Sequence, residues 1–297
     1  MTGITLLDGG MGQELIHRAG DRPTPLWSTQ VMRDHPGLVR AVHADYFAAG
    51  ATIATTNTYA LHRDRLAPAG IEDEWPALVD AALDEAAAAR VAHGAGRIAG
   101  SVGPLGASYR PDIHPDHATA VPLYRELVAA LAPRVDLVLF ETVASVDHAR
   151  AAVAAGQGCG KPVWIAVTVD DEDGRHLRSG EPVADVVTVL ADGADAVLAN
   201  CSAPEAMPKA LEILMKTGLP FGAYGNAFTQ ITKDFLKDRP TVDALSARRD
   251  MGPEAYAGHA MTWIGQGATI VGGCCETGPA HIAEIAARLR AAGHAIV

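Results

Sequence analysis

Short apolar runs recur at fairly even intervals along the 297-residue chain. Most are rich in Val, Ile, Leu or Ala at successive positions, a pattern typical of parallel strands that are buried on both faces. The runs are Ile4–Gly10, Ala51–Tyr59, Arg97–Pro104, Asp136–Thr142, Pro162–Asp170, Ala196–Ser202, Phe221–Ala227 and Thr269–Cys275. We therefore predict eight buried strands.

Segments rich in Ala and Leu, with helical spacing, lie between these runs. The clearest is Pro76–Gly94, which has Pro near its start and Gly at its end, and a second is Pro253–Gly267. The stretch Ser108–Pro122 is predicted to be a long loop. Alternating strands and helices give a parallel sheet with crossover helices, and eight such units favour a (β/α)8 TIM barrel forming one domain over residues 1–297. A doubly wound open sheet is the alternative.

Composition and charge narrow the possible partners. The chain is 48% hydrophobic and 20% charged, as expected for a globular protein with a large core, and its net charge is −11. This charge disfavours binding to nucleic acid or to an anionic membrane surface. No apolar stretch approaches the ~20 residues of a membrane span, and the N-terminus has no basic leader. We therefore expect a cytoplasmic protein with reduced thiols.

Polar side chains collect where the predicted strands end. The carboxyl ends of barrel strands form the active-site face, so these side chains are expected on one rim. They come from six different strands: Asp8 after the first, Asn57 and Tyr59 after the second, Glu141 after the fourth, Cys201 after the sixth, Asn226 after the seventh, and Cys274 with Cys275 after the eighth.

Three of the four cysteines lie on this predicted rim. Strands six and eight are separated by one strand, so Cys201 can approach Cys274 and Cys275. Three thiolates form an open tetrahedral zinc site, with Zn–S distances of about 2.3 Å and a fourth position for substrate. The alternative is that these cysteines are small core residues. Cys159 lies before the fifth strand, off the rim, and is predicted to be structural.

The chain resembles the homocysteine S-methyltransferase family over essentially its whole length. The resemblance is carried by "LLDGGMGQEL" (Leu6–Leu15), "GSVGP" (Gly100–Pro104), "NCS" (Asn200–Ser202) and "VGGCCETGPAHI" (Val271–Ile282). It implies a (β/α)8 barrel that holds Zn²⁺ through Cys201, Cys274 and Cys275 as catalytic ligands. It also implies two small-molecule substrates, homocysteine and a methyl donor. The fourth zinc position would take the homocysteine sulfur.

The resemblance also implies roles for residues that would hold the two substrates. Glu141 and Asp8 match family carboxylates at the amino group of homocysteine, and backbone amides of Gly9, Gly10 and Met11 would face its carboxylate. Each of the two carboxylates has a structural alternative, as a turn or rim residue. Aromatic faces suit an onium donor. Trp27 and Tyr59 are candidates on the donor side, with packing against the first loop as the alternative. Asn57 and Asn226 are either ligand contacts or turn residues.

A charge argument narrows the donor class. A zinc ion with three cysteinates has a net charge of −1, and the bound homocysteine thiolate lowers it to −2. A positively charged methyl donor is therefore favoured. We expect a sulfonium, with S-methylmethionine first and a betaine-type ammonium or a different thiol acceptor as alternatives. The segments "GGCCETGP", "YGN" and "LANC" depart from common family patterns without removing a ligand, and they bear on the donor branch.

Two other classes of function remain as alternatives. Gly272 and Gly273 after the last strand could bind a phosphate, as in a sugar-phosphate isomerase or aldolase. The chain could also be a non-catalytic module that holds zinc or homocysteine. His114 and His117 are spaced for a metal but are predicted to be solvated loop residues.

Overall fold

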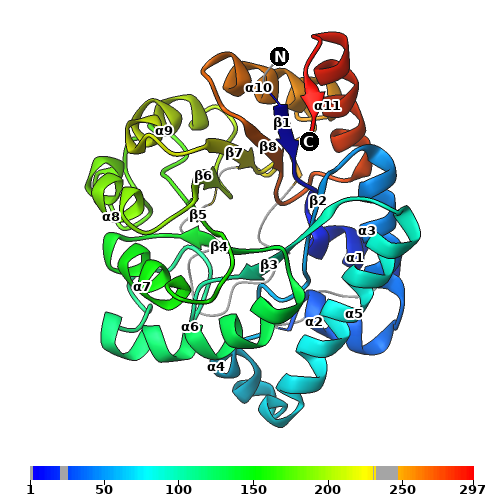
Figure 1. Cartoon of the computed structure of the whole chain (residues 1–297), viewed down its shortest axis with the longest axis vertical. Coiled ribbons are helices and arrows are strands. Elements are labelled where there is room, and N and C mark those ends of the chain that lie inside the picture. The colour runs from blue at the N-terminus through cyan, green and yellow to red at the C-terminus, as the bar shows by residue number, and fades with distance from the viewer. Residues whose placement is uncertain (1–2, 21–25, 230, 232–246) are drawn as a thin grey trace.

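The computed structural model describes residues 3–20, 26–229, 231 and 247–297. A parallel sheet of nine strands, in the order β2-β3-β4-β5-β6-β7-β8-β1-β9, curls through the centre of the molecule (Figure 1). The strands are β1 (Gly3–Leu6), β2 (Ile53–Thr55), β3 (Arg97–Val102), β4 (Leu137–Val143), β5 (Val163–Val167), β6 (Ala196–Asn200), β7 (Phe221–Gly225), β8 (Ile270–Gly273) and β9 (Ala295–Ile296).

Helices surround the sheet on its outer side (Figure 1). They are α1 (Met11–Ala19), α2 (Ser28–Asp34), α3 (Leu38–Ala49), α4 (Arg63–Leu66), α5 (Trp75–His93), α6 (His117–Leu131), α7 (Val146–Gly156), α8 (Val187–Ala191), α9 (Met207–Leu214), α10 (Pro253–Gly265) and α11 (Pro279–Ala291). The two helices predicted from the sequence correspond to α5 and α10. Helix α5 ends where Gly94 adopts a left-handed conformation, with φ of 81°.

Each predicted apolar run overlaps one strand of the sheet, so the predicted alternation of strands and helices is confirmed. From β2 to β8 the strand order follows the sequence, whereas a doubly wound sheet reverses direction at a switch point. The doubly wound alternative is therefore wrong. A single parallel bridge, Leu7 to Ile53, lies between the end of β1 and β2. The short strand β9, which pairs with β1, was not predicted.

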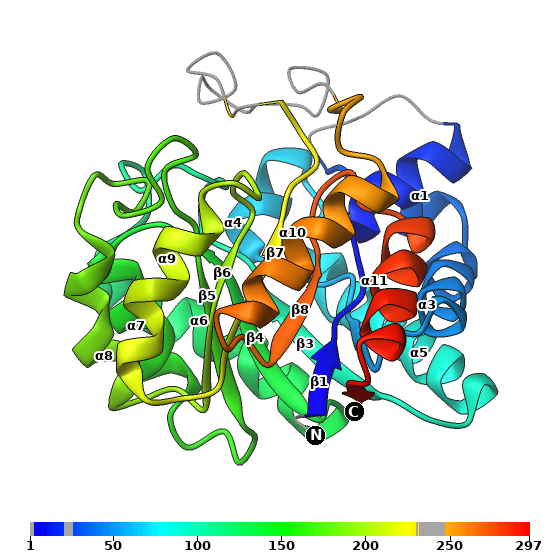
Figure 2. The ribbon, with the colours of Figure 1, turned by 90° about the horizontal axis from the view of Figure 1, so that it is seen from above.

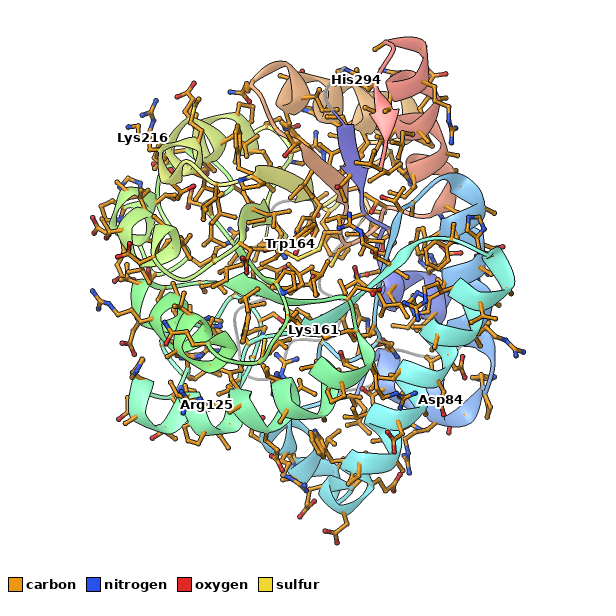
Figure 3. The ribbon with its side chains drawn as sticks, in the orientation of Figure 1. Asp84, Arg125, Lys161, Trp164, Lys216 and His294 are labelled. Atoms are coloured by element: carbon orange, nitrogen blue, oxygen red, sulfur yellow. A yellow bond between two sulfur atoms is a disulfide. The ribbon has the colours of Figure 1, made fainter. Side chains whose placement is uncertain are left out.

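Alternation along the strands separates an inner core from an outer one. Leu137 and Leu139 of β4 face inward, in a cluster with Trp164, Leu198 and other strand residues. Their neighbours Val138 and Phe140 belong to the larger cluster that includes helix residues. Figure 3 places Trp164 near the centre of the sheet, while Asp84, Arg125 and Lys216 lie at the periphery. Helices therefore cover the outer face, and strand side chains fill the interior.

The predicted long loop is shorter than expected. Asp116 caps the N-terminus of α6 by accepting a hydrogen bond from the Thr119 N–H, so the helix begins at His117, inside the predicted loop Ser108–Pro122. Pro122 lies within the helix, near its start. The expectation of a solvated His114 is wrong, because its Nε2 is 2.9 Å from the Tyr124 hydroxyl and its ring stacks on His148.

The carboxyl ends of the strands point to one side of the molecule, opposite the chain termini (Figure 2). The loops that follow the strands therefore meet on this side. Within the described ranges, no helix is long and apolar enough to cross a lipid bilayer.

Candidate active site

A cavity of about 490 Å³ opens among the carboxyl ends of the strands. Several of its walls continue the inward-facing side of the strands. Ser101 lies two positions after Ala99 on β3, and Glu141 lies two positions after Leu139 on β4, so each points inward like the apolar residue before it. In the same way Thr55 follows Ile53 on β2. The last inward position of these strands is thus polar, and the buried interior changes there from a hydrophobic core into a binding site.

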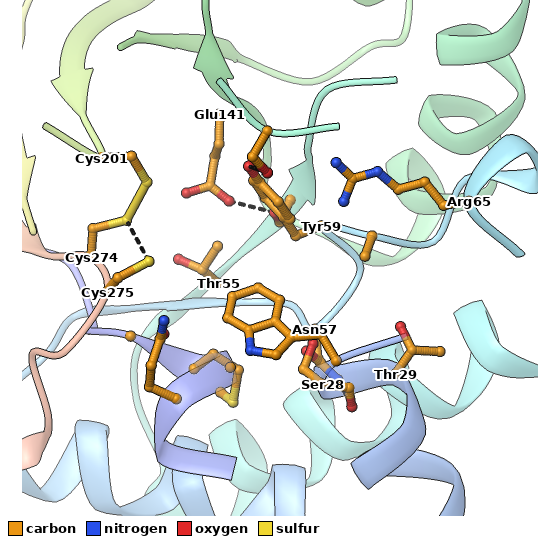
Figure 4. Close-up of a pocket in the computed structure, with 18 of the residues that line it drawn as sticks. Ser28, Thr29, Thr55, Asn57, Tyr59, Arg65, Glu141, Cys201, Cys274 and Cys275 are labelled. Atoms are coloured by element: carbon orange, nitrogen blue, oxygen red, sulfur yellow. Dashed lines mark hydrogen bonds between the residues drawn. A yellow bond between two sulfur atoms is a disulfide. The ribbon is translucent and has the colours of Figure 1, made fainter. Parts of the chain in front are cut away.

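The three rim cysteines meet at one edge of this cavity (Figure 4). Their sulfur atoms all lie within 4.8 Å of one another, and the Sγ atoms of Cys274 and Cys275 are 3.9 Å apart. Tetrahedral zinc with Zn–S distances of about 2.3 Å requires S···S separations of roughly 3.8 Å. The Cys274–Cys275 pair meets this separation, and the donor set suits zinc once Cys201 is reduced. In this structure Cys201 and Cys274 are joined by a disulfide, which the sequence did not predict. Oxidised sulfurs cannot serve as thiolate ligands, so the disulfide and the metal exclude each other.

Burial keeps the remaining thiol of this cluster protonated. Desolvation raises the pKa of Cys275 to about 12, and the carboxylates of Glu276 and Glu141 act in the same direction. The side-chain amide of Gln13 hydrogen-bonds this sulfur and partly opposes the shift. A thiolate at this position therefore needs a cation beside it, which a divalent metal supplies.

Close backbone packing aims the vicinal cysteines at the cavity. A Cβ on Gly10 would lie 2.6 Å from the Cys274 carbonyl oxygen, and one on Gly273 would overlap the side chain of Thr277. Thr277 accepts a hydrogen bond from the Gly10 N–H at its carbonyl and donates one from its hydroxyl to the Cys274 carbonyl. Glycine at these two positions allows the loops after β1 and β8 to pack closely against each other.

Asn226 contacts the backbone of Cys275 and is not among the residues that line the cavity. Its Oδ1 accepts a hydrogen bond from the Cys275 N–H at 3.3 Å, and its side chain is 3% exposed. Among the two readings left open by the sequence, these contacts support a structural one, in which Asn226 positions Cys275.

Two strained residues lie beside the site. Cys201 has φ of 48° and Thr142, next to Glu141, has φ of 60°. Such conformations cost about 1–3 kcal/mol each in residues other than glycine. Asn200 accepts a hydrogen bond from the Thr142 N–H at 3.0 Å, and its Nδ2 lies 3.4 Å from the Cys201 sulfur. The buried side-chain amide of Asn200 therefore contacts both strained residues, including the metal-ligand candidate Cys201.

Two carboxylates line the cavity near its base. Asp8 accepts hydrogen bonds from the Thr55 N–H at 2.6 Å and the Thr55 hydroxyl at 2.7 Å. Glu141 accepts one from the Ser101 hydroxyl and another from the Tyr224 hydroxyl at 2.9 Å. Burial raises the pKa of Asp8 to about 7, with the Glu141 charge adding to the shift, and burial also raises the pKa of Glu141. Two desolvated acids in one cavity form a site for a cation.

The start of α1 supplies groups for an anion at the same end of the cavity. Met11, Gly12 and Gln13 are its first three residues, and N–H groups there have no acceptor within a helix. Gly9 also lines the cavity, but the Gly10 N–H is already engaged by Thr277. The Gly10 N–H is therefore not free for a carboxylate, and the N–H groups at the start of α1, including that of the predicted Met11, remain as candidates.

The predicted aromatic residues lie on the wall of the cavity. Trp27 has φ of 49°, and its indole N–H is buried without a hydrogen-bond partner among the described residues. Tyr59 bonds through its hydroxyl to Ser108 at 2.8 Å, so its ring is held in place. Asn57 also lines the cavity, with its Nδ2 donating to the Ser28 carbonyl at 3.3 Å. The two rings offer the apolar faces expected for an onium group.

The sequence interpretation missed other residues at the cavity, namely Gln13, Thr55, Arg65, Ser101, Tyr109 and Tyr224. Thr55 and Ser101 carry a signal that could have found them, because each is a polar residue two positions after an inward apolar one. Gln13 and Arg65 lie on helices, where spacing alone does not indicate that a side chain reaches the site.

The sequence profile of the homocysteine S-methyltransferase family matches residues 5–289. The chain belongs to the homocysteine S-methyltransferase family. It is 33% identical to a homocysteine S-methyltransferase of Escherichia coli, over 96% of this chain and 95% of that protein. It is 30% identical to homocysteine S-methyltransferase YbgG of Bacillus subtilis, over 97% and 95%.

A solved structure from this family has the same fold. The metallated form of the homocysteine methyltransferase MmuM from Escherichia coli superimposes with a TM-score of 0.80 at 32% identity, covering 96% of each chain. The family resemblance stated from the sequence is therefore confirmed.

Proposed function

We propose that this family member transfers a methyl group from an onium donor to the sulfur of homocysteine, giving methionine, with zinc held by Cys201, Cys274 and Cys275. The observation that carries the proposal is the meeting of three thiols with two buried carboxylates in one cavity. The thiols suit a metal that binds a substrate sulfur, and the carboxylates suit the ammonium of an amino acid.

In this proposal the side chains around homocysteine bind and orient it. Asp8 and Glu141 pair with its ammonium group, and the N–H groups at the start of α1 face its carboxylate. Zinc, when bound, supplies a positive charge that keeps the homocysteine thiol ionised at neutral pH. The sulfur then forms a bond to the donor methyl carbon. The bond from that carbon to the onium atom breaks, and its electron pair stays on the donor, which leaves neutral.

Charge also favours the donor class. Three cysteinates, the substrate thiolate and the neighbouring Asp8 and Glu141 make this end of the cavity anionic, so a cationic donor is attracted and loses its charge as the methyl transfers. A sulfonium is a better methyl donor than a quaternary ammonium. We therefore place S-methylmethionine first, with a betaine-type donor or another thiol acceptor as the alternatives. Trp27 and Tyr59 would face the onium group.

We further infer that residues 1–297 act as one domain and that its sheet closes into an eight-stranded barrel. The Thr52 N–H donates to the Leu6 carbonyl at 2.7 Å, beside the Leu7–Ile53 bridge, so the two edges are in hydrogen-bonding contact. A reducing compartment such as the cytoplasm suits the proposal, because zinc needs all three thiols reduced.

A phosphate-binding barrel is less well supported. A Cβ on Gly272 would lie 2.5 Å from the Leu7 Cβ, and the space beside Gly273 is filled by Thr277. These glycines therefore serve the packing of neighbouring backbone and leave little room for a phosphate group.

Turnover tests the proposal directly and separates it from a non-catalytic binding module. The protein is reduced, loaded with zinc and incubated with homocysteine and, separately, S-methylmethionine, betaine, dimethylsulfoniopropionate or S-adenosylmethionine. We expect loss of the homocysteine thiol and formation of methionine, fastest with S-methylmethionine. Zinc binding without turnover from any donor would contradict the proposed activity. Faster turnover with betaine would change only the donor assignment.

A further inference from the structure

Arg65 is a charged residue of the cavity whose Nε finds no hydrogen-bond acceptor among the described residues. It lies on α4, a few residues after Tyr59, and lines the cavity. Its Nε is buried, and within the described part of the chain it has no hydrogen-bond partner and no carboxylate in ion-pair range. The centre of the guanidinium is 5.7 Å from the centre of the Tyr59 ring. Figure 4 shows the group directed toward Tyr59, across the cavity from the three cysteines.

Neighbouring arginines are satisfied by the protein, in contrast to Arg65. On the same helix, Arg63 pairs with Glu126 at 2.8 Å and lies over the Trp75 ring. Arg110, another cation that lines the cavity, pairs with Asp112 at 2.7 Å. Asp64 also lines the cavity, but its carboxylate accepts a hydrogen bond from the Gly106 N–H. Arg65 is therefore the cavity cation that is best placed to receive an anion from a ligand.

The position of Arg65 indicates which ligand carries that anion. Homocysteine, in the proposed function, has its carboxylate at the start of α1, and Gly10 there packs directly against Cys274 and Cys275. Both charged ends of the acceptor are thus held beside the cysteines. Arg65 lies on the other side of Tyr59 (Figure 4), where the part of the donor remote from its methyl group must extend.

We propose that Arg65 binds the carboxylate of the methyl donor, with Tyr59 holding the guanidinium in place. The site then selects a zwitterion: an onium centre near the aromatic rings and a carboxylate at Arg65. This inference rests on the proposed methyl transfer and specifies the chemical class of its donor. A planar guanidinium suits a carboxylate because two parallel N–H groups can donate to its two oxygens.

A pair of donors that differ only in this carboxylate tests the inference. The donors are S-methylmethionine and its carboxamide, and the measurement is kcat/KM for loss of the homocysteine thiol. We expect the wild type to prefer the acid by about 10- to 100-fold, equivalent to about 1.4–2.8 kcal/mol. Arg65→Met should abolish this preference, and Arg65→Lys should keep part of it. The KM for homocysteine and the zinc content should not change in either variant.

Arg63→Met is the matched control, since it removes the same charge from the same helix but outside the cavity. It should keep the full preference for the acid. Equal losses with both donors in Arg65→Met would indicate a structural role and overturn the inference. An increased KM for homocysteine in Arg65→Met would assign Arg65 to the acceptor and also overturn it. A wild type that methylates homocysteine with neither donor would overturn the proposed function itself, which the unchanged wild-type chain reveals without any variant.

Discussion

The two ends of the cavity are built in different ways. The proposed acceptor end, with Asp8, Glu141 and Cys201, comes from strand ends, and these three residues are at most 8% exposed. The proposed donor end, with Trp27, Tyr59 and Arg65, comes from two loops and a short helix, and these residues are half-buried. The proposed acceptor end carries carboxylates and thiols, whereas the proposed donor end is aromatic and carries a cation whose Nε has no acceptor among the described residues.

This difference shows how the curled sheet separates the functions of its strand ends from those of its loops. Residues at strand ends are fixed by the hydrogen bonds of the sheet, so they suit a metal and an amino acid that require precise placement. Loops and short helices vary without disturbing the sheet, so they suit the choice of a donor. Changes at the proposed acceptor end should therefore weaken the binding of metal or homocysteine, while changes at the proposed donor end should alter the use of the donor.

The strongest test removes a proposed metal ligand from the acceptor end. Reduced wild type should bind about one zinc per chain, and Cys274→Ala should retain below about a tenth of it. Its activity should fall at least about a hundredfold, because a free thiol is only about 3% ionised at pH 7 and is no longer positioned. Metal analysis and kinetics measure both effects. Cys159→Ala, which removes a thiol off the rim, should behave as wild type, and full zinc in Cys274→Ala would contradict the ligand assignment.

A smaller effect is expected from the charge that holds the amino group. Glu141→Gln removes a partner of the ammonium, and homocysteine affinity should fall by about 1.5–3 kcal/mol, or roughly 10- to 100-fold. Zinc content should stay the same. Calorimetric titration measures the affinity, and Glu126→Gln, on the exposed side of α6, is the control. Unchanged affinity in Glu141→Gln would show that this carboxylate has another role.

At the donor end, Trp27→Ala should lower kcat/KM for the onium donor by about 2- to 30-fold, the range of a cation–π contact worth about 0.5–2 kcal/mol. Homocysteine affinity should stay within twofold of wild type, since the ring belongs to the other end of the cavity. Trp27→Phe should recover most of the loss by restoring an aromatic face. Equal losses of kcat/KM for the donor and of affinity for homocysteine in Trp27→Ala would contradict the proposed division between the two ends.

The smallest effect concerns pH. Burial raises the pKa of Asp8 to about 7, so its carboxylate is protonated below that pH and cannot pair with an ammonium. Affinity for L-methionine, which has no thiol to titrate, should rise by less than about tenfold from pH 6 to pH 8. Titrations at several pH values measure this change. Asp8→Asn should bind more weakly and show a flat profile; an unaltered slope in that variant would assign the titration to another group.

Much of the fold followed from local pattern. Each apolar run became a strand because its consecutive apolar residues alternate between an inner core, as Leu139 does, and an outer one, as Phe140 does. The strand β9 was missed because it is only Ala295–Ile296, too short to give a pattern. The start of α6 was misplaced because Pro122 resembled a loop residue, whereas Asp116 already caps the helix.

The sequence by itself determined that the residues at the strand ends gather on one side, because parallel strands in order bring their carboxyl ends together. That is sufficient to bring Cys201 toward Cys274 and Cys275, and Asp8 toward the same cavity as Glu141. Only the tertiary structure decided what each group does there. It joined two sulfurs in a disulfide, engaged the Gly10 N–H with Thr277 and placed Asn226 against the backbone of Cys275. It also left the Nε of Arg65 without an acceptor among the described residues. The physical reason is that hydrogen bonds and burial depend on atoms far apart in the chain, whereas the strand pattern depends on neighbours.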